Sequence, residues 1–281
     1  MKVSGRDLAQ KILEDLKTDI SQNNLKPGLA IILAGSDPSS EIYVNRKIEK
    51  ASEIGISAEL LRFSENEREK VLEKIDELNR DPSVSGIIVQ YPVYSGWDFE
   101  EISQKVSPEK DVDGFTANSP FFGATALGVW EMLKEFAKIE GLSIEDFLAG
   151  KKIVILGKGR AAGGPTIKLL KSKGYNPEIV DSKTQNPDEI IKTGDMVISA
   201  TGKKHIVNGS NIKEGSDVIG VGVGREDIDE QQKTFGDINE KEVSEKAKLY
   251  SPTIGGIGPL TVACLLKNVT ESAHRTQSSR T

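Results

Sequence analysis

Short continuous apolar runs alternate with segments of helical periodicity along most of the chain, and this alternation limits the possible folds more than any other feature. Residues 29–34, Leu-Ala-Ile-Ile-Leu-Ala, form one such run, and runs of this kind are typical of strands buried on both faces of a parallel sheet. Around it, residues 5–23 repeat an apolar side chain every four positions, as an amphipathic helix does. Strands that alternate with helices predict an α/β fold.

The alternation occurs in both halves of the chain. We expect strands at residues 29–34, 57–63, 86–90, 152–156, 177–181, 195–199, 217–220 and 249–250. We expect helices at residues 5–23, 39–55, 67–79, 98–106, 126–138, 164–173, 187–192 and 259–273. A length of 281 residues is ample for two domains. The sequence therefore predicts two domains with parallel-type sheets, the second a Rossmann-like, doubly wound domain.

Composition excludes several classes of protein. The net charge of −6 argues against a nucleic-acid-binding protein, which would carry a basic face. No apolar run reaches the ~20 residues of a membrane span, and the N-terminus has no signal-peptide core. A single cysteine, Cys264, points to a reducing cytoplasm. The two histidines stand outside any ligand cluster, so we expect no metal.

The helix expected at residues 39–55 carries a tyrosine and a lysine beside its apolar stripe. Pro38 and the Ser39-Ser40 pair are typical of a helix start, and Gly55 of a helix end. Tyr43 and Lys47 are four residues apart, so their side chains lie one above the other. Burial would lower the pKa of such a lysine and make it an acid/base group. A solvated lysine on an ordinary amphipathic helix is the alternative.

A glycine-rich turn, Gly157-Lys-Gly-Arg-Ala-Ala-Gly-Gly-Pro165, stands between an expected strand and an expected helix. In that position glycines let the backbone approach a pyrophosphate, and the helix N-terminus supplies free N–H groups. The spacing is one residue longer than the usual dinucleotide fingerprint. A plain tight turn is the alternative.

The ends of the later strands offer further cofactor contacts. Asp181 favours NAD, because an acidic residue there holds the ribose 2′-hydroxyl, whereas Ser182, Lys183 and Lys158 suit the 2′-phosphate of NADP. A turn without function is the alternative. Segments 200–202 and 220–222 place small residues at strand ends, where a cofactor lies in open α/β folds.

Two more loops carry candidate chemistry. Segment 110–114, Lys-Asp-Val-Asp-Gly, has two carboxylates, which are open to three interpretations: a weak metal site, a grip on a substrate's N–H groups, or solvated charge. Segment 252–261 is rich in glycine but has no basic residue. It does not look like a phosphate site and is suited to the close approach of a flat ligand.

These motifs together, in this order, resemble the bifunctional methylenetetrahydrofolate dehydrogenase/methenyltetrahydrofolate cyclohydrolase family of the FolD type. The resemblance covers about residues 2–275. The matching motifs are Ser40-x-x-Tyr43-x-x-x-Lys47, Val89-Gln90-x-Pro92, Lys110-Asp-Val-Asp-Gly114, the turn 157–165, Ser182-Lys-Thr, Ala200-Thr-Gly202, Gly236-Asp237 and Gly255-Gly-Ile-Gly-Pro-Leu-Thr261.

The resemblance implies a reaction and an assembly. 5,10-Methylenetetrahydrofolate would transfer a hydride to NADP, with NAD possible, and the resulting methenyl cation would be hydrolysed to 10-formyltetrahydrofolate. Residues 1–122 plus 254–281 would form the folate-binding, catalytic domain and residues 123–253 the cofactor domain, with the active site in a cleft between them. It further implies a cytoplasmic homodimer that acts on tetrahydrofolate derivatives, with no metal, nucleic acid or membrane partner.

The resemblance also implies residue roles. Lys47 would handle protons in the hydrolysis, Gln90 would tune it, Tyr43 would stack on the folate and Asp113 would grip the pterin. Further substrate contacts would come from Ser40, Val89, Pro92, Gly255, Gly256, Gly258, Pro259 and Leu260. Cofactor contacts would come from Thr125, Gly157, Lys158, Gly159, Arg160, Gly163, Ser182, Lys183, Ala200, Thr201, Gly202 and Gly222.

The chain departs from the family pattern mainly on the cofactor side. Segment 123–126 reads Gly-Ala-Thr-Ala instead of Pro-Cys-Thr-Pro, segment 157–159 reads Gly-Lys-Gly instead of Gly-Arg-Ser, and Asp181 stands where the family often has histidine. Three alternatives stay open at this point. They are a monofunctional dehydrogenase of the same family, another two-domain NAD(P) oxidoreductase such as a shikimate or amino-acid dehydrogenase relative, and a non-enzymatic folate- or dinucleotide-binding protein.

Overall fold

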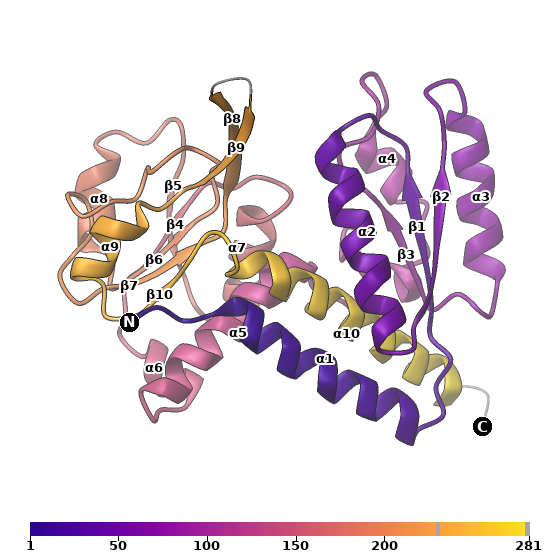
Figure 1. Cartoon of the computed structure of the whole chain (residues 1–281), viewed down its shortest axis with the longest axis horizontal. Coiled ribbons are helices and arrows are strands. Elements are labelled where there is room, and N and C mark those ends of the chain that lie inside the picture. Colours follow the sequence, from indigo (N-terminus) through magenta and orange to yellow (C-terminus); the bar gives the residue numbers. More distant parts are fainter. Residues whose placement is uncertain (229–230, 279–281) are drawn as a thin grey trace. The chain divides into compact units, whose positions relative to one another are not determined.

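A computed structural model of the chain describes residues 1–228 and 231–278 (Figure 1). The chain divides into two compact units, and each contains one parallel sheet. The three-stranded unit comprises Gln10–Ala124 and Val262–Thr281, and the five-stranded unit comprises Met1–Ala9 and Thr125–Thr261. The predicted α/β class with two parallel-type sheets is confirmed.

The sheet of the three-stranded unit has the order β2-β1-β3. Its strands are β1 (Gly28–Leu33), β2 (Ser57–Arg62) and β3 (Gly86–Val89). All pairings are parallel, and Ile31 of β1 pairs with Leu60 on one side and Ile88 on the other. Every residue of β1 and β3 is buried. The continuous apolar runs in the sequence thus became central strands because helices cover both faces.

Helices of this unit pack on both sides of the sheet (Figure 1). They are α2 (Pro38–Glu53), α3 (Arg68–Arg80), α4 (Phe99–Ser103) and a 3-10 turn at Pro108–Lys110. Val71 and Ile75 of α3 and Ile102 of α4 share a core cluster with Ile32 of β1. Figure 1 draws α2 on the other side of the strands from α3. The helix expected at residues 98–106 is shorter in the structure, where α4 spans only Phe99–Ser103.

The start of α2 differs from the prediction. Asp37, not the Ser39-Ser40 pair, is the N-cap: its carboxylate accepts from the backbone N–H of Ser39 at 3.1 Å, and Pro38 occupies the first turn. An aspartate at this position satisfies an N–H group that the helix itself leaves unpaired. At the other end, Gly55 has φ +90, as predicted for a residue that terminates a helix in the left-handed region.

The sheet of the five-stranded unit has the order β10-β7-β6-β4-β5. Its strands are β4 (Ile153–Leu156), β5 (Glu178–Val180), β6 (Met196–Ser199), β7 (Asp217–Gly220) and β10 (Tyr250–Ser251), and all run parallel. The strand order reverses between β4 and β6, and in such open sheets a ligand binds at the carboxyl ends of the strands beside that reversal.

Helices complete this unit and continue into the other. The local helices are α6 (Ile144–Leu148), α7 (Gly163–Ser172), α8 (Pro187–Thr193) and α9 (Glu240–Lys246). Ile191 of α8 and Val243 of α9 pack with Leu156 and Val197 in one core cluster. Three further helices, α1 (Gly5–Gln22), α5 (Ala124–Ile139) and α10 (Ile257–Ser278), contribute residues to both units.

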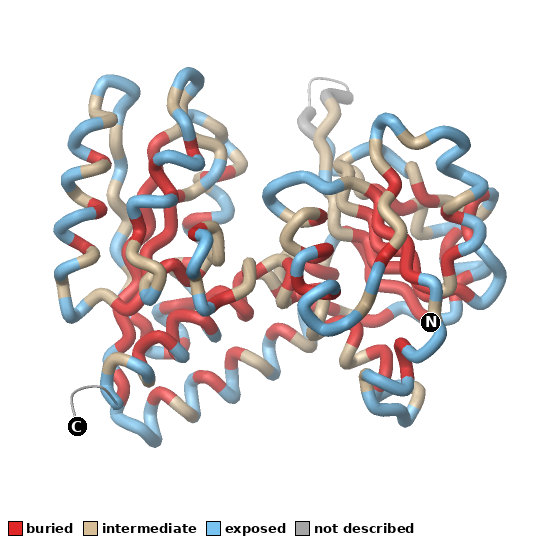
Figure 2. Tube along the Cα trace, turned by 180° about the vertical axis from the view of Figure 1, so that it is seen from behind, coloured by how far each residue is buried: buried red, intermediate tan, exposed pale blue. Residues whose placement is uncertain are grey.

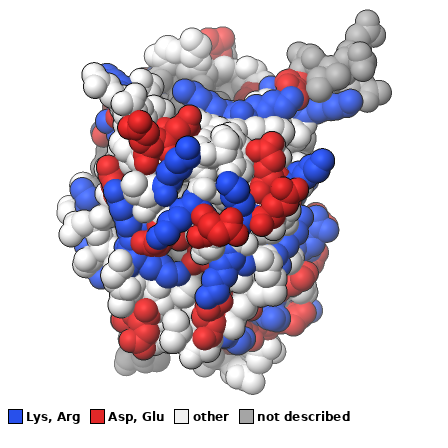
Figure 3. Space-filling model, turned by 90° about the vertical axis from the view of Figure 1, so that its left-hand side faces the viewer, with Lys and Arg blue, Asp and Glu red and all other residues white. Residues whose placement is uncertain are grey.

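An antiparallel ribbon was not predicted. It consists of β8 (Val223–Ile228) and β9 (Gln231–Gly236), and Val223 pairs with Gly236. The central strands of both sheets are buried, whereas the helices expose one side (Figure 2). Lysines and arginines are interleaved with acidic residues on the face seen in Figure 3. Within the described residues, no helix combines the length and the apolar character that crossing a membrane requires.

Candidate active site and cofactor site

Lys47 lies on α2 and is buried, with 8% of its surface exposed. Val44 and Ala51 on the same helix are fully buried, which holds this side of α2 against the unit's core. The Lys47 Nζ donates to Gln90 Oε1 at 2.9 Å. Gln90 follows β3, and its amide nitrogen donates to the Tyr91 carbonyl at 2.8 Å, which fixes which end of the amide faces the lysine. The predicted pair is therefore in direct contact.

The charge state of Lys47 is set by burial and by Asp113. Burial lowers the pKa of Lys47, and the negative charge of Asp113 opposes part of that shift. Burial likewise raises the pKa of Asp113, against the influence of Lys47 and of the backbone N–H of Ala124. The direct partner of Lys47 is a neutral amide, which stabilises the charged form of the lysine less than a carboxylate would. The arrangement supplies an amine that can exchange protons below the usual range of a lysine.

The loop that carries Asp113 is tied to α10. Asn268 is buried, and its Nδ2 donates to the Val112 carbonyl at 2.8 Å and to the Phe122 carbonyl at 3.1 Å. Gly114 has φ +71, and a Cβ there would meet the Phe121 carbonyl oxygen at 2.8 Å. The loop is therefore closed tightly on both sides of Asp113. Asn268 was absent from the predicted site, since an asparagine inside an apolar helix gives no sequence signal for a distant partner.

Four other predicted folate-side residues, Ser40, Tyr43, Val89 and Pro92, lie in the same unit as this pair. Ser40 is buried, and its Oγ donates to the Asp37 carboxylate at 3.2 Å. Tyr43 exposes 37% of its surface, so its ring is available to a ligand. Val89 ends β3, and Pro92 follows a cis peptide bond after Tyr91. The three-stranded unit thus brings Ser40, Tyr43, Lys47, Val89, Gln90, Pro92 and Asp113 onto α2, the end of β3 and the adjoining loop.

The glycine turn after β4 has the geometry of a phosphate cradle. Gly157 has φ +88, and a Cβ there would meet the Ala200 carbonyl oxygen at 2.5 Å. A Cβ on Gly163 would lie 2.2 Å from the Gly157 carbonyl oxygen. Gly163 also opens α7, and the backbone N–H of Gly164 donates to the Gly159 carbonyl at 2.9 Å, so the turn folds back against the helix start. Glycine is thus required at both positions, and the bare backbone beside a helix N-terminus fits a pyrophosphate.

At the next strand, Asp181 follows β5 and contacts the glycine turn. Its carboxylate pairs with the Lys158 ammonium at 2.8 Å and accepts from the backbone N–H of Lys183 at 2.9 Å. These contacts, that with Lys158 first, lower the pKa of Asp181 to about 2. Ser182 and Lys183 are exposed beside it. Arg160 and Gly159 lie in the same turn as Lys158.

The turn after β6 is held by a fully buried carboxylate, Asp237. One of its oxygens accepts from the Ser199 hydroxyl at 2.8 Å and from the backbone N–H of Thr201 at 2.7 Å. A Cβ on Gly222 would meet that carboxylate at 2.2 Å. Asp237 therefore positions the predicted segment Ala200-Thr201-Gly202. The Gly236-Asp237 motif was recognised in the sequence, but the contact of Asp237 with Ser199 and Thr201 depends on the tertiary structure.

The other predicted residues belong to the five-stranded unit. Thr125 lies in the first turn of α5, and its hydroxyl accepts from the Thr261 hydroxyl at 3.4 Å. Gly255 has φ +82, Gly256 directly precedes α10, and Gly258, Pro259 and Leu260 lie in the first turn of α10, within the same unit. The structure does not bring this segment together with Lys47, Gln90 and Asp113 inside one unit. The predicted domain boundaries, which assigned residues 254–281 to the folate domain, stay a prediction.

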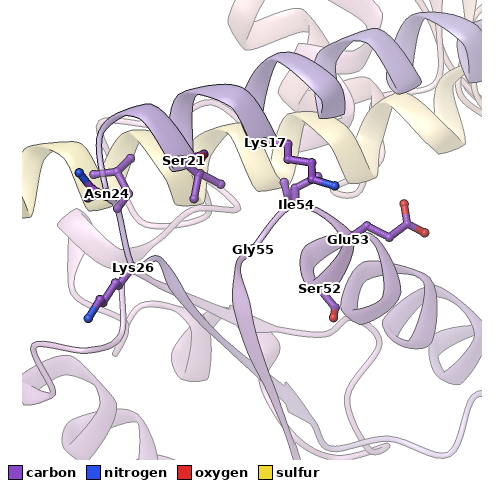
Figure 4. A pocket seen from close by; sticks show the side chains of 10 residues that line it. Lys17, Ser21, Asn24, Lys26, Ser52, Glu53, Ile54 and Gly55 are labelled. Atoms are coloured by element: carbon purple, nitrogen blue, oxygen red, sulfur yellow. The ribbon is translucent and has the colours of Figure 1, made fainter.

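A surface hollow of about 550 Å³ lies elsewhere in the three-stranded unit (Figure 4). It is lined by residues from the ends of α1 and α2, among them Lys17, Asn24 and Glu53, and it contains none of the predicted site residues. In the part of the chain that the structure describes, no cluster of three or more His, Cys, Asp or Glu side chains could hold a metal ion.

Comparison with known proteins identifies the family. Residues 3–113 match the model of the tetrahydrofolate dehydrogenase/cyclohydrolase catalytic domain, and residues 123–277 match that of the NAD(P)-binding domain of the same enzymes. The chain belongs to this family. The tetrahydrofolate dehydrogenase/cyclohydrolases are α/β enzymes with the two-domain organisation described above.

Relatives match the chain over its full length. The bifunctional protein FolD of Acetivibrio thermocellus is 37% identical, with 96% of each chain covered. Among solved structures, the bifunctional FolD of Campylobacter jejuni is 31% identical, with a TM-score of 0.88 and with 98% of this chain and 99% of the other covered. The FolD of Trypanosoma brucei, crystallised with NADP and an inhibitor, is 28% identical, with a TM-score of 0.90 and with 100% and 99% covered.

Family membership decides the reaction class. The chain is a bifunctional methylenetetrahydrofolate dehydrogenase/cyclohydrolase enzyme of one-carbon metabolism, which binds NAD(P) and tetrahydrofolate derivatives. The shikimate or amino-acid dehydrogenase alternative and the non-enzymatic alternative are wrong. The residues present fit the cofactor, because Gly157 and Gly163 let the backbone of the turn close tightly beside the start of α7, and nothing lies within 4 Å of where a Cβ on Gly159 would stand.

Proposed function

We propose that the three-stranded unit carries the proton chemistry of the cyclohydrolase step and that Lys47 is its acid/base residue. The observation that carries this proposal is the buried contact of Lys47 Nζ with Gln90 Oε1 at 2.9 Å. A lysine held by a neutral amide and lowered in pKa by burial can gain and lose a proton at a pH below the usual range of a lysine. A lysine paired directly with a carboxylate would stay charged.

Hydrolysis of the methenyl cation needs catalysed proton movements at two atoms. The attacking water must lose a proton as its oxygen bonds to the bridging carbon, and N5 must gain one as its bond to that carbon breaks. The second proton of the water leaves to solvent as the formyl C=O forms, so one proton is released for each cation hydrolysed. We assign both movements to the Lys47 amine, which accepts the first proton and can donate the second. Gln90 orients the amine, Asp113 binds N–H groups of the pterin, and the exposed Tyr43 ring stacks on the folate.

The dehydrogenase step needs positioning more than acid/base catalysis. Bound NADP supplies the hydride acceptor, and the chain's task is to hold the nicotinamide against the folate. We propose that the turn 157–163 holds the pyrophosphate and that the turn 200–202, fixed by Asp237, borders the nicotinamide half. Gly222, Thr125 and segment 255–260 complete the lining. Lys158, Arg160, Ser182 and Lys183 surround the adenosine end.

We propose NADP as the cofactor, with NAD also accepted. The relative from Trypanosoma brucei contains NADP, and four of the residues around the proposed adenosine end are cationic or carry a hydroxyl, which suits a 2′-phosphate. The homodimer and the cytoplasmic location implied by the family resemblance belong to the same proposal. Light scattering of the purified protein tests the dimer: a monomer at assay concentration would contradict it.

One assay tests the proposed function. The protein is incubated with 5,10-methylenetetrahydrofolate and either NADP⁺ or NAD⁺, while methenyl formation and its decay are followed by absorbance. We expect methenyl to form with both cofactors, faster with NADP⁺, and to decay faster than in buffer. Formation without accelerated decay would contradict the role assigned to the Lys47 pair. Faster turnover with NAD⁺ would contradict the cofactor proposal.

A further inference from the structure

Two charged side chains from different segments meet at the carboxyl edge of the five-stranded sheet. Lys158 lies in the glycine turn after β4, and Asp181 directly follows β5, the neighbouring strand. Their charged groups are 2.8 Å apart. The Lys158 side chain is 63% exposed and that of Asp181 21% exposed, so the pair lies at the surface with the carboxylate on the inner side.

The Asp181 carboxylate is held rigidly. Besides Lys158, it accepts from the backbone N–H of Lys183 at 2.9 Å and from the Thr184 hydroxyl at 3.4 Å. The Thr184 hydroxyl in turn accepts from the backbone N–H of Asp181 at 2.9 Å. A carboxylate has about four positions for hydrogen-bond donors. These contacts leave room at the oxygen that faces Lys158 for one more donor.

The position of this pair in the fold defines its ligand. In doubly wound folds the glycine turn binds the pyrophosphate, and the residue after the next strand meets the adenosine ribose. Here those two segments are the turn at 157–163 and Asp181. A ribose 2′-hydroxyl can donate to the carboxylate. A 2′-phosphate in the same place would meet that negative charge and a lysine whose charge is already paired.

We propose that the Lys158–Asp181 ion pair determines cofactor specificity, with Asp181 restricting the preference for NADP by occupying Lys158. This inference rests on the proposed cofactor site. Removing the carboxylate frees Lys158 for the 2′-phosphate. It also removes the charged acceptor to which the ribose 2′-hydroxyl would donate. Both effects shift the chain toward NADP.

Binding measurements test the proposal without turnover. The dissociation constants of NADP⁺ and NAD⁺ are measured by titration calorimetry for the full chain, for Asp181→Asn and for the double variant Asp181→Asn/Lys158→Ala. We expect Asp181→Asn to raise the preference for NADP⁺ over NAD⁺ by about tenfold or more, as relief of a like-charge contact and release of a cation allow. The double variant should lose most of that gain, because the gain depends on the freed lysine.

The same two strands offer a matched control. Lys152 precedes β4 and Glu178 begins β5, and they form an ion pair of 2.7 Å at the amino ends of these strands. Glu178→Gln removes the same charge from the same strand, away from the cofactor edge. We expect its preference to equal that of the parent chain, and unchanged circular dichroism in all variants.

The outcomes separate the two proposals. An unchanged NADP⁺/NAD⁺ preference in Asp181→Asn would overturn the specificity role while the coupled assay still reports on the proposed function. A gain that persists in full in the double variant would overturn the role of the pair and leave Asp181 acting alone. A parent chain that binds cofactor but does not oxidise methylenetetrahydrofolate would contradict the proposed function. The measured cofactor preferences of the variants would still test the role of the ion pair.

Discussion

At the residue scale, the contact of Lys47 with Gln90 makes the sharpest prediction. Lys47→Ala removes the amine that we assign to both proton movements, so methenyl hydrolysis should fall by about a hundredfold or more. Hydride transfer should continue, because it depends on positioning. The coupled absorbance assay would then show methenyl accumulating. Lys50→Ala is the control on the same helix, since Lys50 pairs with Glu53 at the surface. Hydrolysis at the parent rate in Lys47→Ala would remove Lys47 from the mechanism.

The pH dependence of hydrolysis follows from the charges around Lys47. Its neutral form is the base, so the rate should fall as pH drops through the lowered pKa of Lys47. The Asp113 charge raises that pKa, so Asp113→Asn should lower it further and move the acidic limb of the kcat profile to lower pH. The profile is measured at saturating folate, because we also propose that Asp113 binds substrate. Asp76→Asn, an exposed carboxylate on α3, is the control. A limb that moves upward or stays in place would contradict this electrostatic coupling.

At the element scale, much of the fold could be predicted because both faces of each sheet are covered. Strands β1, β3, β4 and β6 are buried along their whole length, so each appears in the sequence as a continuous apolar run. Other elements give no such signal. The β8–β9 ribbon contains a charged run, Arg225-Glu226-Asp227, and α6 and α9 are too short for a helical period to emerge. Ribbon and short helices are fixed by tertiary contacts.

The residues of the candidate site also divide into those that the sequence could predict and those that it could not. Lys47, Gln90 and Asp113 could be found because each stands in a motif at the end of an element or on one helix face. The residues that hold them could not. Asn268 on α10 bonds carbonyls 146 and 156 positions away in sequence, and Asp237 reaches Ser199 over 38 positions. Such long-range hydrogen bonds leave no pattern in a single sequence.

Asn268 gives the first prediction at this scale. Asn268→Leu would leave the Val112 and Phe122 carbonyls without their donor, at a cost to stability of roughly 1–3 kcal/mol. The Asp113 loop would loosen, so the KM for folate should rise more than kcat falls. Thr270→Val is the control: it loses a buried bond to the Leu266 carbonyl within α10 and should lower the melting temperature without changing KM. A rise in KM for both variants would show that loss of stability alone explains the effect.

The glycine turn after β4 gives the second prediction at this scale. In Gly163→Ala the new Cβ would lie 2.2 Å from the Gly157 carbonyl oxygen, so the turn must shift away from its pyrophosphate geometry. We expect binding of NADP⁺ to weaken by tenfold or more, which is about 1.4 kcal/mol, in titration calorimetry. Methenyl hydrolysis needs no cofactor and should be preserved, which also shows that the variant is folded. Parent-like NADP⁺ affinity would contradict the cradle.

At the scale of the whole molecule, we propose that the two compact units carry different parts of the chemistry. The Lys47, Gln90 and Asp113 group belongs to the three-stranded unit, and the glycine turn and Asp181 belong to the five-stranded unit. The predicted cleft between domains and the homodimer stay predictions. The division of labour has a direct consequence: a variant defective in one step should retain the other, and the shared intermediate connects them.

Mixing two defective variants tests that division. Lys47→Ala should convert methylenetetrahydrofolate and NADP⁺ to methenyltetrahydrofolate and stop there. Gly163→Ala should hydrolyse methenyltetrahydrofolate but oxidise its precursor slowly when NADP⁺ is kept well below the weakened dissociation constant of that variant. Combined in one cuvette, they should form 10-formyltetrahydrofolate through the released intermediate, at a rate that rises with the concentration of Gly163→Ala. Each variant alone, at the summed protein concentration, is the control. If the mixture is no faster than Lys47→Ala alone, either Gly163 also supports hydrolysis or Lys47 also supports oxidation, and methenyl formation by Lys47→Ala alone decides between them.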